Sequence, residues 1–213
     1  MDKLADYYAR RASEYEQIYA RPDRSRGVEL LKLKLPELFA GRRVLEIACG
    51  TGYWTGAIAA SAAQVDALDV NDEVLEIART KNVPASKVNF LKGSAYEIPD
   101  FSRSHDALFA GFWWSHVPLE RLDAFLQGVV AALARGALVA FADNLYIEGS
   151  STPASRRDAN GNSYQMRSLR DGSRHEVLKN FPSEPELRAR VASHGANFRY
   201  QQLDCYWLMT FTT

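Results

Sequence analysis

The sequence of 213 residues has no surplus of charge of either sign. Its 26 Lys and Arg residues balance 26 Asp and Glu residues, so the formal net charge at pH 7 is zero. A general nucleic-acid binder needs an excess of basic side chains to neutralise phosphates. We therefore expect a protein with no nucleic-acid partner.

Cysteine is scarce. Cys49 and Cys205 are the two cysteines, and they lie far apart in the chain without the spacing of metal ligands. This pattern predicts reduced thiols in a reducing compartment and no metal site.

Long apolar runs are also absent. No stretch reaches the ~20 apolar residues that a membrane span requires, and residues 1–16 lack the apolar core of a signal peptide. We expect a cytoplasmic protein with no membrane partner. No sequence feature indicates an oligomeric state.

What the sequence does contain is a steady alternation of strand-like and helix-like segments. Short apolar runs predict buried strands at residues 44–48, 65–69, 87–91, 106–110 and 137–142. Amphipathic helices are predicted at residues 54–60, after Asn71, and from Pro118 onward. Such alternation is typical of a doubly wound, mostly parallel α/β sheet, whose ligands bind beyond the carboxyl ends of the strands.

Two regions of the chain depart from this alternation. Residues 2–35 predict one or two helices, and the polar segment 146–182 is longer than an ordinary connection. Within it, Asp171-Gly172 predicts a hairpin. A helix at 185–192 and an antiparallel pair of strands at 198–203 and 206–211 complete a seven-stranded sheet.

We therefore predict one domain over residues 1–213 with four parts. They are an N-terminal helical cap (1–35), a cofactor-binding core (42–145), a substrate-side insertion (146–182) and a C-terminal helix with strands (183–213).

A glycine-containing turn follows the first predicted strand. The run from Glu46 to Gly52 reads Glu-Ile-Ala-Cys-Gly-Thr-Gly, and its glycines allow the backbone to approach a ligand closely. Asp69 ends the next strand, where a carboxylate can accept the hydroxyls of a ribose. An acid at each of two strand ends makes this a stronger signal than Gly-x-Gly alone.

The run Val-Leu-Glu-Ile-Ala-Cys-Gly-Thr-Gly at residues 44–52 resembles motif I of the class I S-adenosylmethionine (SAM)-dependent methyltransferases of small-molecule type. Ala48 stands where that motif often has its first glycine. The resemblance implies SAM as cofactor and S-adenosylhomocysteine (SAH) as product. It also implies that Glu46 and the backbone of residues 48–52 hold the methionine moiety, and that Asp69 binds the ribose.

Three further segments share the resemblance. Residues 93–96 (Gly-Ser-Ala-Tyr) resemble the segment beside the adenine, with Ser94 in place of an acid, and residues 109–116 resemble the segment beside the sulfonium. The Tyr-Tyr-x-x-Arg-x-x-x-Tyr run at 7–15 is similar to helices that cover the cofactor. The implied cofactor-binding residues are Tyr15, Glu46, Ala48, Cys49, Gly50, Thr51, Gly52, Trp54, Asp69, Val70, Asn71, Gly93, Ser94, Ala95, Tyr96, Gly111 and Phe112.

Other functions fit these residues less well. A dehydrogenase would need a third glycine where Thr55 stands, and Glu46 would repel a pyrophosphate while suiting a methionine ammonium. An aminopropyl transferase using a decarboxylated cofactor and a non-catalytic SAM-binding protein stay as alternatives. The favoured function is methyl transfer to a small-molecule acceptor, with oxygen, nitrogen, sulfur and carbon all open as the target atom.

His116 is the candidate catalytic residue. It follows the fourth predicted strand, and imidazole is the usual base at neutral pH. The alternative is that it caps the helix from Pro118 or hydrogen-bonds a carbonyl. A base is needed only if the acceptor atom carries a proton.

The acceptor is expected in an aromatic, water-poor pocket. Its candidate lining residues are Tyr8, Tyr15, Trp113, Trp114 and Tyr164, together with Asn144 and Tyr146 after the fifth strand. Trp113 and Trp114 are adjacent, so we expect one at the ligand and the other in the core.

The segment 146–182 concentrates positive charge at Arg156, Arg157, Arg167, Arg170, Arg174 and His175. A solvated loop is one interpretation. The sharper hypothesis is that Arg167 and Arg174 pair with a carboxylate or phosphate of the acceptor.

Overall fold

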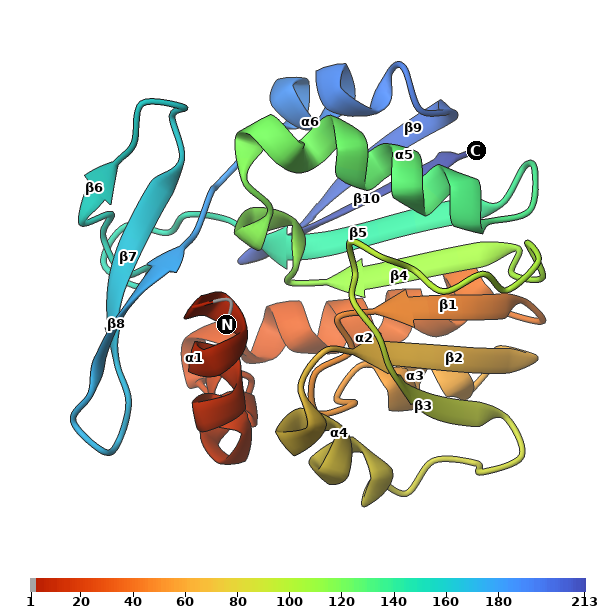
Figure 1. Cartoon of the computed structure of the whole chain (residues 1–213), viewed down its shortest axis with the longest axis horizontal. Helices are drawn as coiled ribbons and strands as arrows, with labels where there is room; N and C mark the ends of the chain where they lie inside the picture. The colour runs from red at the N-terminus through yellow and green to blue at the C-terminus, as the bar shows by residue number, and fades with distance from the viewer. Residues whose placement is uncertain (1–2) are drawn as a thin grey trace.

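The computed structural model describes residues 3–213 and is built on a seven-stranded sheet (Figure 1). The order is β3-β2-β1-β4-β5-β10-β9, in which the first five strands are parallel and β10 runs antiparallel to both β5 and β9. The predicted fold class is therefore confirmed. The strands are β1 (Arg43–Ile47), β2 (Gln64–Asp69), β3 (Val88–Lys92), β4 (Ala107–Gly111), β5 (Leu138–Asn144), β9 (Ala196–Leu203) and β10 (Tyr206–Thr212).

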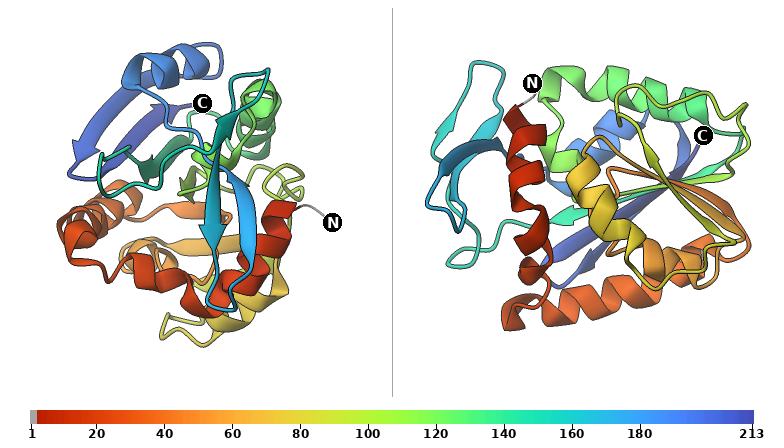
Figure 2. Two further views of the ribbon diagram at one scale, coloured as in Figure 1. Left: turned by 90° about the vertical axis from the view of Figure 1, so that its left-hand side faces the viewer. Right: turned by 60° about the horizontal axis from the view of Figure 1, so that its bottom comes forward.

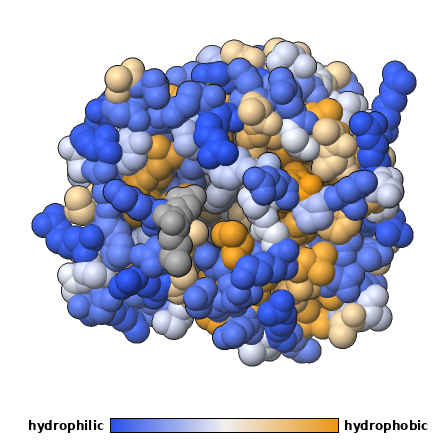
Figure 3. All heavy atoms as spheres, viewed as in Figure 1, coloured by the Kyte–Doolittle hydropathy of each residue, from blue (hydrophilic) through white to orange (hydrophobic). Residues whose placement is uncertain are grey.

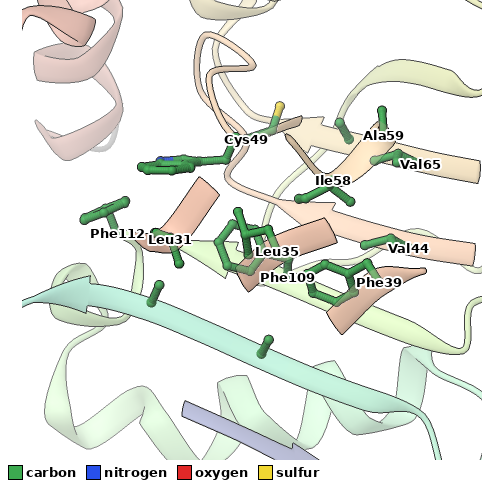
Figure 4. Close-up of a cluster of buried hydrophobic side chains, with 14 of the residues drawn as sticks. Leu31, Leu35, Phe39, Val44, Cys49, Ile58, Ala59, Val65, Phe109 and Phe112 are labelled. Carbon is green, nitrogen blue, oxygen red and sulfur yellow. The ribbon is translucent and has the colours of Figure 1, made fainter. Parts of the chain in front are cut away.

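Helices cover both faces of this sheet, which is why its central strands are apolar on both sides. One face carries α2 (Ser25–Phe39), α3 (Thr55–Ala59) and α4 (Asp72–Arg79), and the other carries α5 (Leu122–Ala132) and α6 (Glu184–Val191). In Figure 4, Leu35 and Phe39 of α2 lie against Phe109 of β4. This packing fixes the strand ends from which the site is built.

The carboxyl ends of the parallel strands are covered by two elements that lie side by side (Figure 2). One is α1 (Lys3–Arg11), continued by the 3-10 helices η1 (Ala12–Ile18) and η2 (Pro22–Arg24). The other is a separate sheet of β6 (Arg156–Arg157), β7 (Ser163–Ser168) and β8 (Arg174–Leu178). Tyr7 of α1 packs with Leu169 and Val177 in a small apolar cluster between them. The predicted hairpin is confirmed, with Gly172 in its turn at φ +83°.

The helix predicted from Pro118 begins later than expected. Pro118 is extended at ψ 139°, a 3-10 turn η4 (Leu119–Arg121) follows, and α5 starts only at Leu122. His116 belongs to another 3-10 turn, η3 (Trp114–His116), so it does not cap α5. Among residues 3–213, no helix is both long and apolar enough to cross a membrane.

Candidate active site

The glycine turn after β1 places three residues in the left-handed region, with φ of 52° at Ala48, 57° at Gly50 and 73° at Gly52. For Ala48 this conformation costs about 1–2 kcal/mol, which explains why a glycine suits that position. A Cβ built on Gly50 would meet no protein atom within 4 Å. The turn therefore holds its backbone away from other side chains, leaving room for a ligand.

Asp69 at the end of β2 binds this turn directly. One carboxylate oxygen accepts the N–H of Gly50 at 2.9 Å, and the other accepts the N–H of Asn71 at 3.0 Å. Burial raises the pKa of Asp69, and these N–H groups act against that rise. Each carboxylate oxygen keeps a second lone pair. The side chain can thus hold the turn and still accept ribose hydroxyls.

Glu46 lies behind the turn and does not line the cavity in front of it. Its carboxyl accepts a 2.6 Å hydrogen bond from the hydroxyl of Thr55, and burial raises its pKa to about 8. Thr55, where a dehydrogenase would have glycine, is therefore the partner of Glu46. The structure thus gives Glu46 a hydrogen bond to the helix that follows the turn, and its contact with the methionine moiety stays a prediction.

In front of the turn lies a cavity of about 250 Å³, which we call the cofactor cavity. Figure 3 shows apolar residues gathered at the middle of this face of the molecule. Twelve of the residues predicted to bind the cofactor line it: Tyr15, Ala48, Gly50, Asp69, Val70, Asn71, Gly93, Ser94, Ala95, Tyr96, Gly111 and Phe112. Leu4, Ala5 and Val74 also line it and were not predicted.

Four other predicted cofactor residues shape the turn from outside the cofactor cavity. Thr51 donates a hydrogen bond to Glu16 at 2.6 Å, and the indole of Trp54 stacks on Phe112 with ring centroids 5.7 Å apart. Gly52 lies so close to Phe90 that a Cβ would come within 3.2 Å of it. Cys49 is buried in the core, and burial raises the pKa of its thiol, so it offers no thiolate at neutral pH.

A second cavity, of about 90 Å³, adjoins the first, and we call it the acceptor cavity. Four residues line both cavities: Tyr8, Tyr15, Phe112 and His116. Its other lining residues are Arg11, Ile18, Tyr19, Arg21, Arg24, Asn144, Ser150, Ser151, Thr152, Gln165, Arg167, Lys179, Phe181 and Tyr206.

His116 lies at the junction of the two cavities. Its Nδ1 is 2.6 Å from the carbonyl oxygen of Leu178, and its Nε2 is 2.8 Å from the hydroxyl of Tyr8. A carbonyl can only accept, so Nδ1 carries the proton, and Tyr8 donates to Nε2 of the neutral ring. Burial, together with the positive charges of Lys179 and Arg167, holds the pKa of His116 well below its ordinary range.

Comparison with known proteins agrees with this geometry. The model of a family described as "Methyltransferase domain" matches residues 44–136. Two solved structures of DhpI, one with SAH and one with SAM and HEP, have 29% sequence identity. They cover 98% of this chain and 94% and 95% of their own, with TM-scores of 0.76 and 0.78. Residues 44–136 therefore form a domain of the class I, SAM-dependent methyltransferase type, with SAM as cofactor.

Curated relatives are similar over a shorter stretch. A demethylmenaquinone methyltransferase of Clavibacter sepedonicus is 36% identical over 90 residues, which is 41% of this chain and 37% of the relative. One from Bacillus licheniformis is 29% identical over 116 residues, or 49% and 50%. The match spans half or less of the length of these relatives.

The structure places only some of the predicted acceptor residues at the cavities. Tyr8, Tyr15 and Trp113 line the cavities, together with Asn144 and Arg167. Trp114 instead packs in the core against Phe141 and Trp207, so the two adjacent tryptophans are split as predicted.

Three further acceptor candidates lie outside both cavities. The hydroxyl of Tyr164 donates to Asp158 at 3.0 Å, and Tyr146 is 48% exposed beside Phe181. In the β7–β8 register, Arg174 lies opposite Ser168, whereas Arg167 lies opposite His175. Arg174 is exposed. Neighbouring positions on a strand face opposite sides, so Arg167 and Arg174 cannot both face the cavity.

The residues that sequence reasoning missed are mainly the cations of the acceptor cavity. Arg11 had a local signal, because Tyr8, Arg11 and Tyr15 recur at helical spacing on one face. Arg24 and Lys179 had none, since only the tertiary fold brings η2 and the end of β8 to the same cavity.

Proposed function

We propose that this methyltransferase transfers the methyl group of SAM to a small molecule bound in the acceptor cavity. The observation that supports this most directly is the continuity of the two cavities through Tyr8, Tyr15, Phe112 and His116. A methyl donor in one cavity and an acceptor in the other would meet at these four side chains. The volume of about 90 Å³ suits a small acceptor.

SAM, when bound, supplies a methyl group already activated on a cationic sulfur. The protein's residues then have to align the acceptor and exclude water, and alignment alone can contribute several kcal/mol. Phe112 contributes to this positioning. Its φ of 61° directs it from the end of β4 to the boundary of the cavities, where Tyr19 and Trp54 pack against it.

The electrostatics argue against a general base at this boundary. Burial raises the pKa of Tyr8 and makes its phenol a poor source of phenolate. The positive surroundings of His116 oppose its taking up a proton. We therefore favour an acceptor whose nucleophilic atom needs no deprotonation, such as an ionised oxygen or sulfur.

The named relatives support a small acceptor without identifying it. DhpI has been solved with SAM and HEP together, and the curated relatives are named for demethylmenaquinone. Neither name transfers directly, since the first rests on 29% identity and the second on less than half of this chain.

Calorimetric titration with SAM and SAH tests the proposal. Asp69→Asn should weaken both affinities by about tenfold or more through loss of a charged hydrogen-bond acceptor. Asp72→Asn, three residues away at the exposed ion pair with Lys92, is the matched control and should not change them. Mass spectrometry of an acceptor incubated with SAM, and separately with decarboxylated SAM, then separates methyl transfer from aminopropyl transfer. Folded protein that binds neither SAM nor SAH would overturn the proposal.

A further inference from the structure

The acceptor cavity carries more positive charge than its own residues neutralise. Five cationic side chains line it, from the end of α1, from η2 and the residue before it, and from β7 and the residue after β8. Lys179 is paired, because its ammonium binds the buried Asp143 at 2.9 Å. Arg21 is paired as well, through two hydrogen bonds to Asp23. The remaining three are Arg11, Arg24 and Arg167.

Arg11 and Arg167 have no carboxylate partner among residues 3–213. The guanidinium of Arg11 lies over the ring of Tyr15 at 5.2 Å and forms no hydrogen bond or ion pair there. Arg167 donates twice to the neutral amide oxygen of Gln165, at 2.6 and 3.2 Å. Both are close enough to Tyr8 to affect its titration. Their charges therefore converge on the junction of the two cavities.

Arg24 is the most buried of the three, at 4% exposure. Two of its nitrogens donate to neutral oxygens, those of Asn144 at 3.0 Å and Ser150 at 3.2 Å. Its Nε has no hydrogen-bond partner in the described part of the chain, and the carboxylate of Asp23 stays 3.8 Å away. A buried guanidinium with a free N–H is costly unless something accepts from it.

Tyr206 adds a second free donor at the same place. It is 1% exposed, its hydroxyl forms no hydrogen bond within residues 3–213, and the guanidinium of Arg24 lies 5.9 Å from the centre of its ring. Both side chains line the acceptor cavity. Two buried donors without a hydrogen-bond partner, and the charges of Arg11 and Arg167 without a carboxylate partner, surround one cavity. They favour one kind of occupant, an anion rich in oxygen acceptors.

We propose that the acceptor carries an oxyanion, a carboxylate or a phosphate-type group, bound by Arg11, Arg24, Arg167 and the hydroxyl of Tyr206. The proposal rests on the proposed function and names the acceptor class for that site. Arg167, whose positive charge also opposes protonation of His116, is one of the side chains that attract this group. A positively charged sulfonium in the neighbouring cavity would add to that attraction.

The test is calorimetric titration of SAH-saturated protein with two probes, inorganic phosphate and acetate. We expect saturable binding of at least one, and the stronger probe identifies the type of oxyanion. Tyr206→Phe should weaken that binding about threefold to tenfold, and Arg24→Gln and Arg167→Gln about tenfold or more. Arg174→Gln, on the same small sheet but outside the cavity, is the matched control and should leave it unchanged.

Binding of SAH is measured for every variant and separates the two proposals. SAH binding with no saturable binding of either probe would overturn the oxyanion subsite and leave the methyltransferase proposal standing. Saturable anion binding by protein that does not bind SAH would overturn the methyltransferase proposal and leave the anion-binding site standing. Equal weakening by Arg174→Gln would show a diffuse charge effect and also overturn the subsite. Tyr206→Phe removes a hydroxyl that has no partner, so loss of folding does not confuse its result.

Discussion

Tyr8 and His116, from opposite sides of the active site, are joined by a 2.8 Å hydrogen bond at the boundary of the cofactor and acceptor cavities. The bond uses the only unprotonated nitrogen of the imidazole, because the other donates to the carbonyl of Leu178. A nitrogen that is occupied in this way, in positive surroundings, positions Tyr8 rather than accepting a proton from the acceptor.

This arrangement predicts a modest catalytic role for His116. His116→Gln should lower kcat for methyl transfer by less than about tenfold, whereas loss of a true general base costs about 10²–10⁴-fold. The wild-type rate should show no acid limb near the ordinary pKa of histidine. The rate at which SAH is formed, followed from pH 5 to 9 in both proteins, measures kcat and its pH dependence. A hundredfold loss together with a histidine-dependent limb would restore His116 as the base.

Gly50 gives a prediction about the cofactor cavity. In Gly50→Val the new side chain meets no protein atom near its Cβ and points into open space beside the ligand. We expect SAH affinity to fall between about tenfold and a hundredfold, from overpacking worth ~1–3 kcal/mol.

The control for Gly50→Val is Gly172→Val at the tip of the β7–β8 hairpin. Gly172 has φ +83° and also has open space around its Cβ, but it lies outside both cavities. Both substitutions introduce similar backbone strain, so their melting temperatures should fall alike. Normal SAH binding by Gly50→Val would show that the ligand does not approach this turn.

Glu46 predicts a pH dependence of stability. Its pKa is raised by burial to about 8 in the folded protein, above the ordinary value near 4.3. The folded state then holds the proton more tightly than the unfolded state, so this contribution is complete at low pH and is lost as pH rises toward 8. The depressed pKa of His116 acts in the opposite direction, but only below its ordinary value near 6.5.

The window from pH 6.5 to 8 therefore separates the contribution of Glu46 from that of His116, and comparison with Glu46→Gln isolates it from those of other groups. In urea unfolding of the cofactor-free protein, the free energy of unfolding of the wild type should decline across this window. Glu46→Gln keeps an oxygen for the hydroxyl of Thr55 and should remove most of the decline. Parallel curves for the two proteins would mean that Glu46 is ionised in the folded state.

Gly128 offers a gain in stability. It lies exposed in the middle of α5, and a Cβ there would meet nothing within 4 Å. Gly128→Ala should raise the free energy of unfolding by roughly 0.5–1 kcal/mol and the melting temperature by up to about 4 °C. Ala124→Gly, one turn earlier and also exposed, is the reverse control and should lower both. A loss of stability in Gly128→Ala would indicate a contact on this face of α5.

The sequence was sufficient to predict those parts of the structure that depend on residues close together in the chain or on neighbouring parallel strands. Alternating apolar segments gave the sheet, and the turn around Gly50 with Asp69 gave the cofactor cavity, because neighbouring parallel strands place these residues at one edge. The direction in which a side chain points was harder to predict from the sequence. Glu46 lies within the motif yet turns toward Thr55, a choice fixed by packing between β1 and α3.

The acceptor cavity was the least predictable part. Arg167 was expected there and Arg24 was not, although both are arginines in polar surroundings. What distinguishes Arg24 is its burial against the end of β5 and the segment that follows, which no local pattern reveals. Arg174 was expected and turned away because strand register, which the sequence leaves open, decides its face.

The matched family segment, residues 44–136, contains only two of the residues that line the acceptor cavity, Phe112 and His116. All the others come from before or after it. The stretch before residue 44 serves both cavities, because Leu4, Ala5, Tyr8 and Tyr15 also line the cofactor cavity, whereas no residue after position 136 does. Exchanging the stretch after residue 136 for that of another methyltransferase should therefore alter the acceptor cavity while every residue that lines the cofactor cavity stays in place.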